Sequence, residues 1–561
     1  MQRDARKSST KADEPPPKRK RGTPKLKKQE TGLDDVLVVD VKNLLRRHEP
    51  LREARKPGEE VPPTVLHAFR SKDFPETEVT VEELSSTGDG LALSLALDHV
   101  YVVPFTVPGD RVRIKVCKTI EEESYSETDL VEVLEPSPQR NDSLINCQYF
   151  GKCSGCQLQM MTYEDQLKHK KRVIEKAYKN FSGILPELIP PIGDTMGSPL
   201  QYGYRTKLTP HFSRPRLRKQ SADKEGSPEP PAIGFVKKGR RQVLDIEDCP
   251  LGTPIVRRGL KNERERVLQN FDQFKSGATI LIRESTSRKK KPEPSNGQST
   301  DTQQRNSEDH GRTMQPADAD VVQKEFLDYI EEKRYVTDPN SRSSEYVDDY
   351  LFHTQAGTFF QNNNSILSPF IAYIRENVRP PIQPESESNG AGVTKPPPNI
   401  KYLLDAYCGS GLFTITLSKL FLSSLGIDIS TPGIYCARAN ALANDCPNAG
   451  FAAADAADLF RDVPYPPDQT LLIIDPPRKG CDMNFLNQML AFGPTRVIYV
   501  SCNVHTQARD VGVLVEGGNG NRYEIESIRG FDFFPQTGHV ESVAVLNKVT
   551  ETEKKEVDKS R

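Results

Sequence analysis

Two short β-branched runs with a helical stretch between them constrain the fold of this chain most strongly. The segment Leu471–Asp510 begins L-L-I-I-D-P-P-R-K-G and ends R-V-I-Y-V-S-C-N-V-H-T-Q-A-R-D. Short runs that are apolar throughout are typical of parallel strands that are buried on both faces. We therefore predict strand, turn, helix, strand, turn and helix in this segment, as in an open α/β sheet.

Both predicted strands are followed directly by polar residues. Asp475, Pro476, Pro477 and Arg478 come after the first strand, and Cys502 stands just after the second. Open α/β sheets form their sites at the carboxyl ends of strands, so Cys502 is a candidate nucleophile. The alternative is a small buried hydrophobic residue, which is the usual role of a free cysteine.

The same alternation extends over residues 400–548. Y-L-L-D-A-Y predicts a strand, G-L-F-T-I-T-L-S-K-L-F-L a helix and S-S-L-G-I-D-I a second strand. A helix at Thr431–Asn444, a strand near Phe451, and strands at Arg522–Ile528 and Glu541–Leu546 complete the pattern. We predict an α/β fold with seven strands in this region, a doubly wound sheet with a closing hairpin.

The N-terminal region divides into a basic tail and a β-rich segment. Residues 1–28 carry eleven Lys and Arg against three acidic residues, so we expect residues 1–72 to be a disordered tail and linker with one helix near Val36–Arg47. The tail could be a nuclear address, an RNA-contacting tail or only a solubilising segment. Residues 73–138 alternate in short runs, which predicts a small all-β barrel of the kind that binds oligonucleotides. A barrel without an RNA role remains open.

A cysteine quartet marks the central region, residues 139–378. Cys147, Cys153 and Cys156 follow C-x5-C-x2-C spacing, and Cys249 stands in D-I-E-D-C-P-L. Ten cysteines in so long a chain favour a reducing compartment over a disulfide scaffold. Four thiolates suit zinc or an iron–sulfur cluster, and the three-plus-one layout favours [4Fe–4S] over paired zinc knuckles. Cysteines with a purely structural role are the alternative.

Other segments bound the domains. We predict a helix at Met161–Phe181 and strands at Tyr202–Pro210, Ala232–Val236 and Gln242–Ile246. Polar, Pro-rich composition predicts disordered inserts at 214–231, 288–319 and 379–399, and a charged tail at 549–561. No apolar run has the length of a membrane span and no hydrophobic leader follows Met1, so we expect a soluble intracellular protein.

The turn D-A-Y-C-G-S-G-L-F lies where a Rossmann-type sheet binds its cofactor. Gly409 and Gly411 allow close backbone approach to a ligand, but the third glycine of a dinucleotide fingerprint is missing. Asp428 ends the second strand, where a carboxylate binds ribose hydroxyls. These residues alone leave NAD and S-adenosylmethionine open, and the downstream residues suit methyl transfer.

Four motifs together resemble one family. D-A-Y-C-G-S-G, I-I-D-P-P-R-K-G, V-S-C-N and P-Q-T-G-H-V-E-S-V are similar to those of the RNA 5-methyluridine methyltransferases, most like the fungal-type tRNA (uracil-5-)-methyltransferases. The resemblance covers roughly residues 74–548. It implies a Rossmann-like class I S-adenosylmethionine methyltransferase sheet, preceded by a TRAM-like barrel and a cysteine-rich central domain. It also implies methylation of carbon 5 of a uridine in RNA, the T-loop uridine 54 of tRNA.

The resemblance also assigns roles to single residues. It makes Cys502 the nucleophile that adds to carbon 6 and Glu541 the base that removes the proton from carbon 5, with His539 as a rival base. We expect the following helix N-terminus and Arg478 to favour the Cys502 thiolate. It places a [4Fe–4S] cluster on the four cysteines, as in bacterial rRNA-directed members. Its S-adenosylmethionine-binding residues are Gln361, Tyr407, Asp428 and Asp475, although Gln361 could be a surface loop amide.

Other functions remain as alternatives. One is a uridine-5 methyltransferase that acts on rRNA. A 5-methylcytidine methyltransferase usually has its nucleophile after Pro or Thr, unlike Ser501-Cys502-Asn503. A non-catalytic RNA-binding or RNA-folding protein would have no reason to keep both Cys502 and Glu541. The expected partner is RNA, with no membrane and no obligate protein partner, in the nucleus and/or cytoplasm, with the mitochondrion left open.

Overall fold

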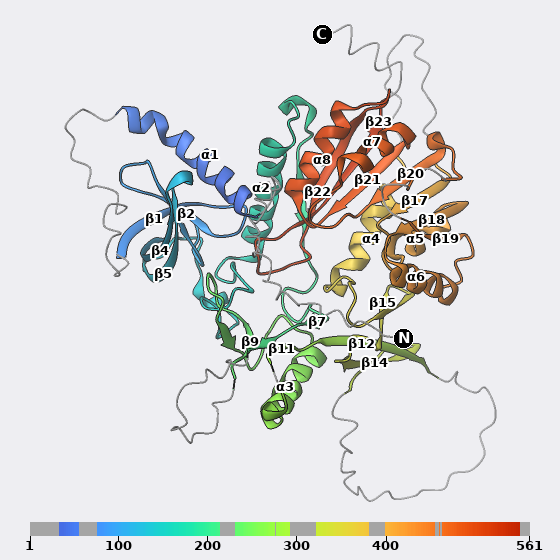
Figure 1. Cartoon of the computed structure of the whole chain (residues 1–561), viewed down its shortest axis with the longest axis horizontal. Coiled ribbons are helices and arrows are strands. Elements are labelled where there is room, and N and C mark those ends of the chain that lie inside the picture. Colours follow the sequence, from blue (N-terminus) through green and yellow to red (C-terminus); the bar gives the residue numbers. More distant parts are fainter. Residues whose placement is uncertain are drawn as a thin grey trace, which may run out of the picture.

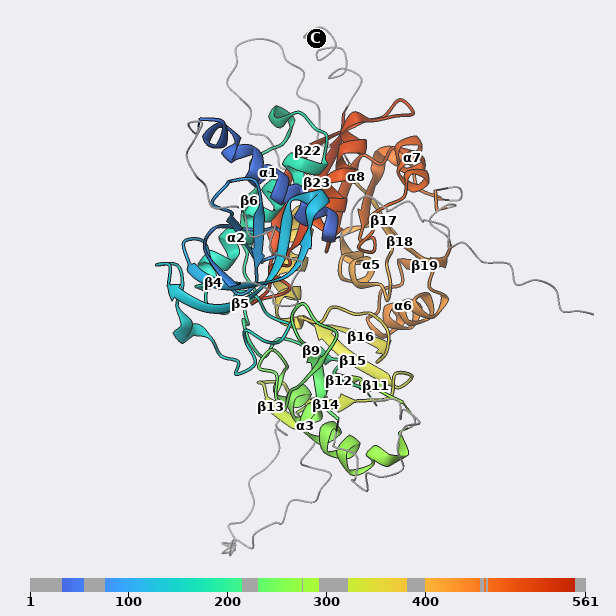
Figure 2. The same ribbon diagram turned by 60° about the vertical axis from the view of Figure 1, so that its left-hand side comes forward.

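The computed structural model describes residues 33–54, 76–213, 231–274, 276–291, 321–380, 399–454, 459–460 and 463–549. Most of the predicted N-terminal tail and linker, almost all of the first insert, most of the other two inserts and nearly all of the C-terminal tail therefore lie outside the described residues. Figure 1 shows a β-barrel (blue) and a large sheet (orange to red) on either side of a long helix, α2 (Tyr163–Phe181). A third region, green to yellow, lies below both in Figures 1 and 2.

The large sheet has the predicted α/β topology with one additional strand. Its order is β19-β18-β17-β20-β21-β23-β22-β6, with β17 parallel to both β18 and β20 and with β23 antiparallel to its two neighbours. The four-residue strand β6, from the central region, adds the eighth member and was not predicted. The strands are β17 (Tyr402–Ala406), β18 (Ser423–Asp428), β19 (Ala449–Ala453), β20 (Thr470–Ile474), β21 (Arg496–Ser501), β22 (Tyr523–Phe531), β23 (Glu541–Lys548) and β6 (Gly193–Met196).

The apolar runs are explained by burial on both faces of this sheet. In β20, Leu471 and Ile473 point into one core cluster, and Leu472 and Ile474 point into the other. The first cluster includes residues of α4 (Leu367–Glu376), α5 (Leu412–Thr416) and α6 (Thr431–Ala443). The second includes residues of α2, α7 (Met483–Phe492) and α8 (Val504–Glu516). Because helices cover both faces, no polar alternation is needed.

One predicted helix is shorter than expected. The run after Gly411 forms only the five-residue α5, followed by a separate 3-10 turn at Ser418–Leu420. Thr416 Oγ1 donates to Leu412 O at 2.7 Å, and Ser418 Oγ donates to Ile415 O at 2.9 Å. Hydroxyls that bond to the backbone in this way compete with regular helix, so the apolar periodicity overestimated its length.

The predicted all-β barrel is confirmed as a closed five-stranded barrel of order β1-β2-β3-β5-β4. The helix α1 (Leu33–Glu53) contains the helix expected near Val36–Arg47, and its Val41 and Leu44 pack against barrel residues such as Val100. The barrel strands are β1 (Glu76–Leu84), β2 (Gly90–Leu93), β3 (Val100–Val103), β4 (Arg111–Ile120) and β5 (Tyr125–Glu135).

The central region consists of short strands around α3 (Pro254–Gln269). The expected strand at Tyr202–Pro210 is reduced to two residues in β7. The insert expected from Arg288 was placed too early, because Arg288 still belongs to β12, paired with β14, and its guanidinium lies 4.2 Å from the ring centre of Tyr346. The strands are β7 (Lys207–Leu208), β8 (His211–Phe212), β9 (Ile233–Val236), β10 (Val243–Asp245), β11 (Ala278–Thr279), β12 (Ile282–Lys290), β13 (Val322–Glu325), β14 (Tyr329–Val336), β15 (Arg342–Val347) and β16 (Tyr350–Gln355).

The helices bear on the membrane prediction. Among the helices of the described residues, none is both long enough and apolar enough to span a bilayer. The expected cellular compartment stays a prediction.

Candidate active site

A cavity of about 770 Å³ opens at the carboxyl edge of the large sheet, where the strand order reverses between β17 and β20. This is the position at which α/β sheets bind ligands. It is lined by residues at or next to the ends of six strands (β17, β18, β19, β20, β21 and β23) and by the loop after β16. All six catalytic and cofactor-binding residues predicted from the sequence are among them: Gln361, Tyr407, Asp428, Asp475, Cys502 and Glu541.

The glycine turn after β17 forms one end of this cavity. Gly409 and Gly411 have φ values of 54° and 93°, which side chains rarely allow. Asp428 fixes the turn from the end of β18, because its two oxygens accept from Gly409 N at 2.9 Å and Ser430 N at 2.7 Å. The turn therefore exposes backbone to the cavity next to a carboxylate, which suits the adenosine part of a cofactor.

Asp405 supports this turn from below without lining the cavity. It is fully buried in β17, and one of its carboxylate oxygens accepts from Thr414 N at 2.9 Å. Burial raises the pKa of Asp405 to about 7. Its contacts indicate a structural role in the turn rather than a secondary contact to the ligand.

Cys502 stands at the other end of the cavity, directly after β21. Burial, together with the charges of Glu541 and Asp475, raises the pKa of its thiol to about 12, although Arg478 lowers it through its charge and a hydrogen bond. Arg478 thus favours the thiolate, as expected, but burial and the two acidic neighbours outweigh it. The N-terminus of α8 also favours the thiolate less than expected, because the Asn503 side chain already accepts the hydrogen bond of His505 N.

Glu541, which is buried, and Asp475, which is half-buried, form a pair of acidic groups at the site. Burial raises the pKa of Glu541 well above its usual value, and the charge of Asp475 raises it further while Arg478 lowers it. Burial likewise raises the pKa of Asp475 to about 7, with a further contribution from Asp405. Like charges in a water-poor site cannot both ionise readily, so the ligand-free pair retains a proton near neutral pH.

The rival base His539 lies apart from this pair. It is exposed, its ring packs edge-on against Phe534 with 6.0 Å between centroids, and it is not among the residues that line the cavity. Glu541 does line the cavity. Geometry therefore favours Glu541 as the group that can reach a ligand.

Sequence reasoning missed two aromatic residues and one arginine of the site. Phe359 lines the cavity with 77% of its surface exposed, and Phe534 lines it from the loop before β23. Exposed aromatic faces of this kind can stack on nucleobases. Arg205 lines both this cavity and a second one. The amide-rich segment H-T-Q-A-G-T-F-F-Q-N-N-N, which contains Phe359, was the one feature of the sequence that could have indicated this part of the site. No feature of the sequence indicated Arg205.

The second cavity, of about 310 Å³, is lined by all four predicted cysteines, Cys147, Cys153, Cys156 and Cys249. Burial raises the pKa of the Cys156 thiol, and the charges of the other three cysteines raise it further, as expected for thiols that face one another. Within the described residues, no group of three or more His, Cys, Asp or Glu is arranged to hold a single metal ion. The four cysteines thus line one shared cavity.

Comparisons with known proteins agree with this geometry. A family model described as tRNA (Uracil-5-)-methyltransferase matches residues 468–549, which contain Asp475, Cys502 and Glu541. The chain is 40% identical to the tRNA (uracil(54)-C(5))-methyltransferase of Schizosaccharomyces pombe over 93% of this chain and 84% of that protein. It is 43% identical to the protein of the same description from Saccharomyces cerevisiae, over 84% of this chain and 73% of that one.

A solved structure shares the fold. The tRNA (uracil-54, C5)-methyltransferase of Pyrococcus abyssi, determined in complex with S-adenosyl-L-homocysteine, matches 84% of this chain and 100% of its own with a TM-score of 0.54 and 21% identity. A likeness at this identity bears on the fold alone, and it covers far more than the large sheet.

Replacing Asp475 with Asn should stabilise the protein at pH 8 and have a much smaller effect at pH 5. The folded carboxyl has a pKa of about 7, above the unfolded value near 4, so stability falls as pH rises between the two. The neutral amide avoids that loss, roughly 1–4 kcal/mol at about 1.4 kcal/mol for each pKa unit. Thermal unfolding at both pH values measures it, with exposed Asp349→Asn as control. Equal shifts at the two pH values would contradict the argument.

Proposed function

Because the chain belongs to the tRNA (uracil-5-)-methyltransferase family, we propose that it transfers a methyl group from S-adenosylmethionine to carbon 5 of uridine 54 in the T loop of tRNA. The observation that carries the proposal is that one cavity is lined by Cys502, by Glu541 and by the glycine turn at Gly409. A nucleophile, a base and a cofactor cradle converge there, as the reaction requires.

Cys502 supplies the first step. Carbon 5 of uracil is a weak nucleophile, and addition of the Cys502 sulfur to carbon 6 delivers an electron pair to carbon 5, which divides one difficult step into easier ones. Arg478 is the cationic side chain that favours the thiolate form. S-adenosylmethionine, when bound against the glycine turn, supplies the methyl group as an electrophilic sulfonium.

Glu541 completes the reaction. After methylation, carbon 5 carries both a methyl group and a proton, and the sulfur can leave only when that proton is removed. Glu541 accepts the proton, the double bond between carbons 5 and 6 re-forms, and the Cys502 thiolate departs. A carboxylate whose pKa is raised by burial is a stronger proton acceptor once ionised, and a positioned base typically contributes about 10²–10⁴-fold.

The remaining assignments are part of the same proposal. Tyr407 and Asp428, at the ends of β17 and β18, hold the adenosine and ribose, while Asp475 and Gln361 face the methionine part and the reacting uracil. All four line the cavity, which supports these roles. The closed barrel β1–β5 is a TRAM-like module that contacts the RNA, supported by its five-stranded closed form.

The cysteine quartet would hold a [4Fe–4S] cluster. Zinc binds sulfur at about 2.3 Å, so four thiolates around one ion leave no cavity between them. The four cysteines instead line one cavity of about 310 Å³, which supports a group larger than a single ion. Such a group would tie the Cys147–Cys156 segment to Cys249, with a structural or RNA-docking role.

Cys502→Ala should abolish methylation and leave RNA and cofactor binding largely intact, because only the attack on carbon 6 needs the thiol. Tritium release from a tRNA transcript with 5-³H-uridine measures turnover, and a transcript with cytidine at position 54 tests the site. Cys117→Ala, in the barrel, is the matched control. Near wild-type turnover of Cys502→Ala would contradict the mechanism. Equal tritium release from rRNA fragments would favour the rRNA alternative. If no RNA released tritium, a non-catalytic protein or a 5-methylcytidine enzyme would be favoured.

Glu541→Gln should trap the enzyme on its substrate. With the methyl group transferred and the proton retained, the sulfur stays bonded to carbon 6, so a denaturant-resistant protein–RNA adduct should accumulate only when S-adenosylmethionine is present. Cys502→Ala in the same chain should eliminate it, and His539→Ala should remain active. A trapped adduct in the His539 variant, with normal turnover of Glu541→Gln, would reassign the base.

Protein purified without oxygen should contain about four iron and four sulfide per chain. Cys249→Ser should lose most of both, because one corner of the cluster would lack its ligand. Metal and acid-labile sulfide analysis decides between the alternatives. One equivalent of zinc without sulfide would replace the cluster by a zinc site, and a metal-free protein would leave structural cysteines.

A further inference from the structure

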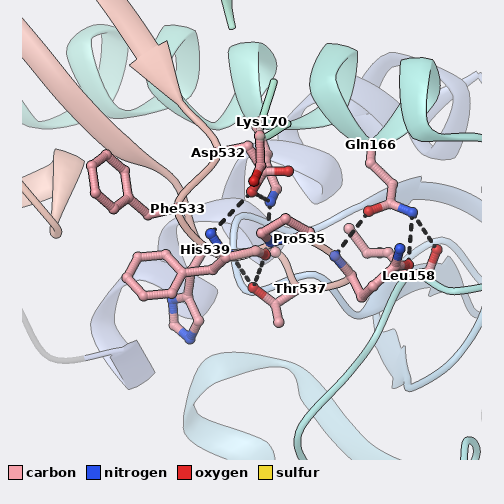
Figure 3. A network of polar contacts seen from close by, with 12 residues as sticks. Leu158, Gln166, Lys170, Asp532, Phe533, Pro535, Thr537 and His539 are labelled. Atoms are coloured by element: carbon pink, nitrogen blue, oxygen red, sulfur yellow. Dashed lines mark hydrogen bonds and ion pairs between the residues drawn. The ribbon is translucent and has the colours of Figure 1, made fainter. Parts of the chain in front are cut away.

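The loop between β22 and β23, residues Asp532–Val540, leads directly into the proposed base, and we name it the base loop (Figure 3). Glu541 is the first residue of β23 and pairs with Phe531 of β22. On the other side, the pairing of β23 with β21 reaches only from Asn547 to Ser542. The backbone of Glu541 therefore has a strand partner on one side only, and its position depends on the base loop before it.

Lys170 of α2 holds the beginning of the base loop. Its ammonium group forms an ion pair with Asp532, and both side chains are fully buried (Figure 3). Lys170 Nζ also donates to Phe534 O at 3.0 Å, and Phe534 N donates to Asp532 Oδ1 at 3.1 Å. The pair thus fixes the backbone on both sides of Phe533.

Gln166, one helical turn earlier, holds the middle of the base loop. Its Oε1 accepts from Gln536 N at 3.1 Å, and its Nε2 donates to Gln536 Oε1 at 3.0 Å and to Leu158 O at 3.1 Å. Gln536 has a φ of 71°, a left-handed conformation that non-glycine residues keep only when their surroundings impose it. Gln166 makes two of the contacts that impose it.

A third contact comes from the residues that follow Cys156. Gln157 N and Leu158 N both donate to Gln536 O, at 2.9 and 3.1 Å. Gly538 N donates to Gln157 Oε1 at 3.3 Å. Gln536 is therefore held through its N–H, its carbonyl and its side chain, by α2 on one side and by the cysteine segment on the other.

From these contacts we infer that Gln166 and Lys170 are positioning residues for proton removal, because they hold the base loop and, through it, Glu541 against the catalytic cavity. Neither residue lines that cavity, so neither touches substrate or cofactor. A buried ion pair adds little net stability over apolar side chains of equal volume, whereas it does define one geometry. The inference deepens the proposed function and rests on it.

The affected step is specific. Glu541 takes the proton from carbon 5, the electron pair of that C–H bond forms the double bond to carbon 6, and the bond from carbon 6 to the Cys502 sulfur breaks to give the thiolate. Cys502 follows β21, whereas the hydrogen bonds of Gln536, Gly538 and Phe534 described above run to α2, to the residues after Cys156 and within the base loop. Displacing the base loop should therefore slow proton removal more than the attack on carbon 6 or methyl transfer.

The test uses the full-length Gln166→Ala protein in single-turnover reactions with S-adenosylmethionine and a tRNA transcript that contains 5-³H-uridine. We expect tritium release to slow about 10- to 100-fold, since a misplacement near 1 Å can cost about 10²-fold, while the denaturant-resistant adduct accumulates. Affinity for S-adenosylhomocysteine should stay within about twofold of wild type. Lys168→Ala, exposed on the same helix, is the matched control and should behave as wild type.

Amide hydrogen exchange gives a readout that does not depend on activity. In Gln166→Ala, residues 532–540 should exchange faster while residues 542–548 of β23 do not change. The double variant Lys170→Met with Asp532→Asn removes both buried charges together, so it avoids an unpaired charge, and it should show the same adduct and the same exchange.

Two outcomes would overturn the inference. One is a parallel loss of adduct formation and tritium release, which indicates a general structural defect. The other is faster exchange of the base loop with wild-type release, which separates the loop from the chemistry. Failure of the proposed function is distinguishable, because the wild-type protein would then release no tritium from tRNA before any variant is tested.

Discussion

Desolvation at the carboxyl edge of the sheet is the constraint on which the rest of this site depends. Cys502, Asp475 and Glu541 line one cavity together with Arg478, whose charge opposes the rise in pKa of both Cys502 and Glu541. Three groups that each prefer to keep a proton cannot be nucleophile and base at the same time without a ligand. The pKa shifts therefore favour the protonated forms of these groups, and the charges of a bound uracil and sulfonium cofactor would change that balance.

Protonation of these groups has consequences for both the cofactor and the thiol. A sulfonium cation next to Asp475 would favour the ionised carboxylate, since an opposite charge at short range lowers the pKa of an acid. A thiolate reacts readily with oxidants and metals, whereas a protonated thiol reacts far more slowly. The raised pKa of Cys502 therefore protects its sulfur, without a cost in stability near neutral pH, because the thiol of the unfolded chain is protonated there as well.

How far the sequence predicted this structure differs from residue to residue. Leu471–Ile474 identified a buried strand because burial on both faces leaves a local signature, and Asp475 and Cys502 followed from position at strand ends. The predicted length of α5 was too great, and the rise in the pKa of Cys502 was not predicted. The hydroxyl contacts and the surrounding carboxylates that cause them are not visible in the local sequence. Gln166 and Lys170 gave no signal, since their partners lie more than 360 positions away in the chain. The local sequence pattern was sufficient to identify the candidate reactive residues, whereas contacts between distant parts of the chain determine how those residues are positioned.

The same long-range contacts make the catalytic sheet dependent on the rest of the chain. β6 pairs with β22, so without the central region β22 would present a free edge that can pair with other chains. Without α2, Asp532 would be a buried charge with no cation, which is far more costly than an exposed one. Gln536 would lose the contacts that hold its left-handed backbone. The boundary near residue 400 therefore marks a change of sequence pattern, whereas the loop before Glu541, our proposed base, makes contacts with residues on both sides of that boundary.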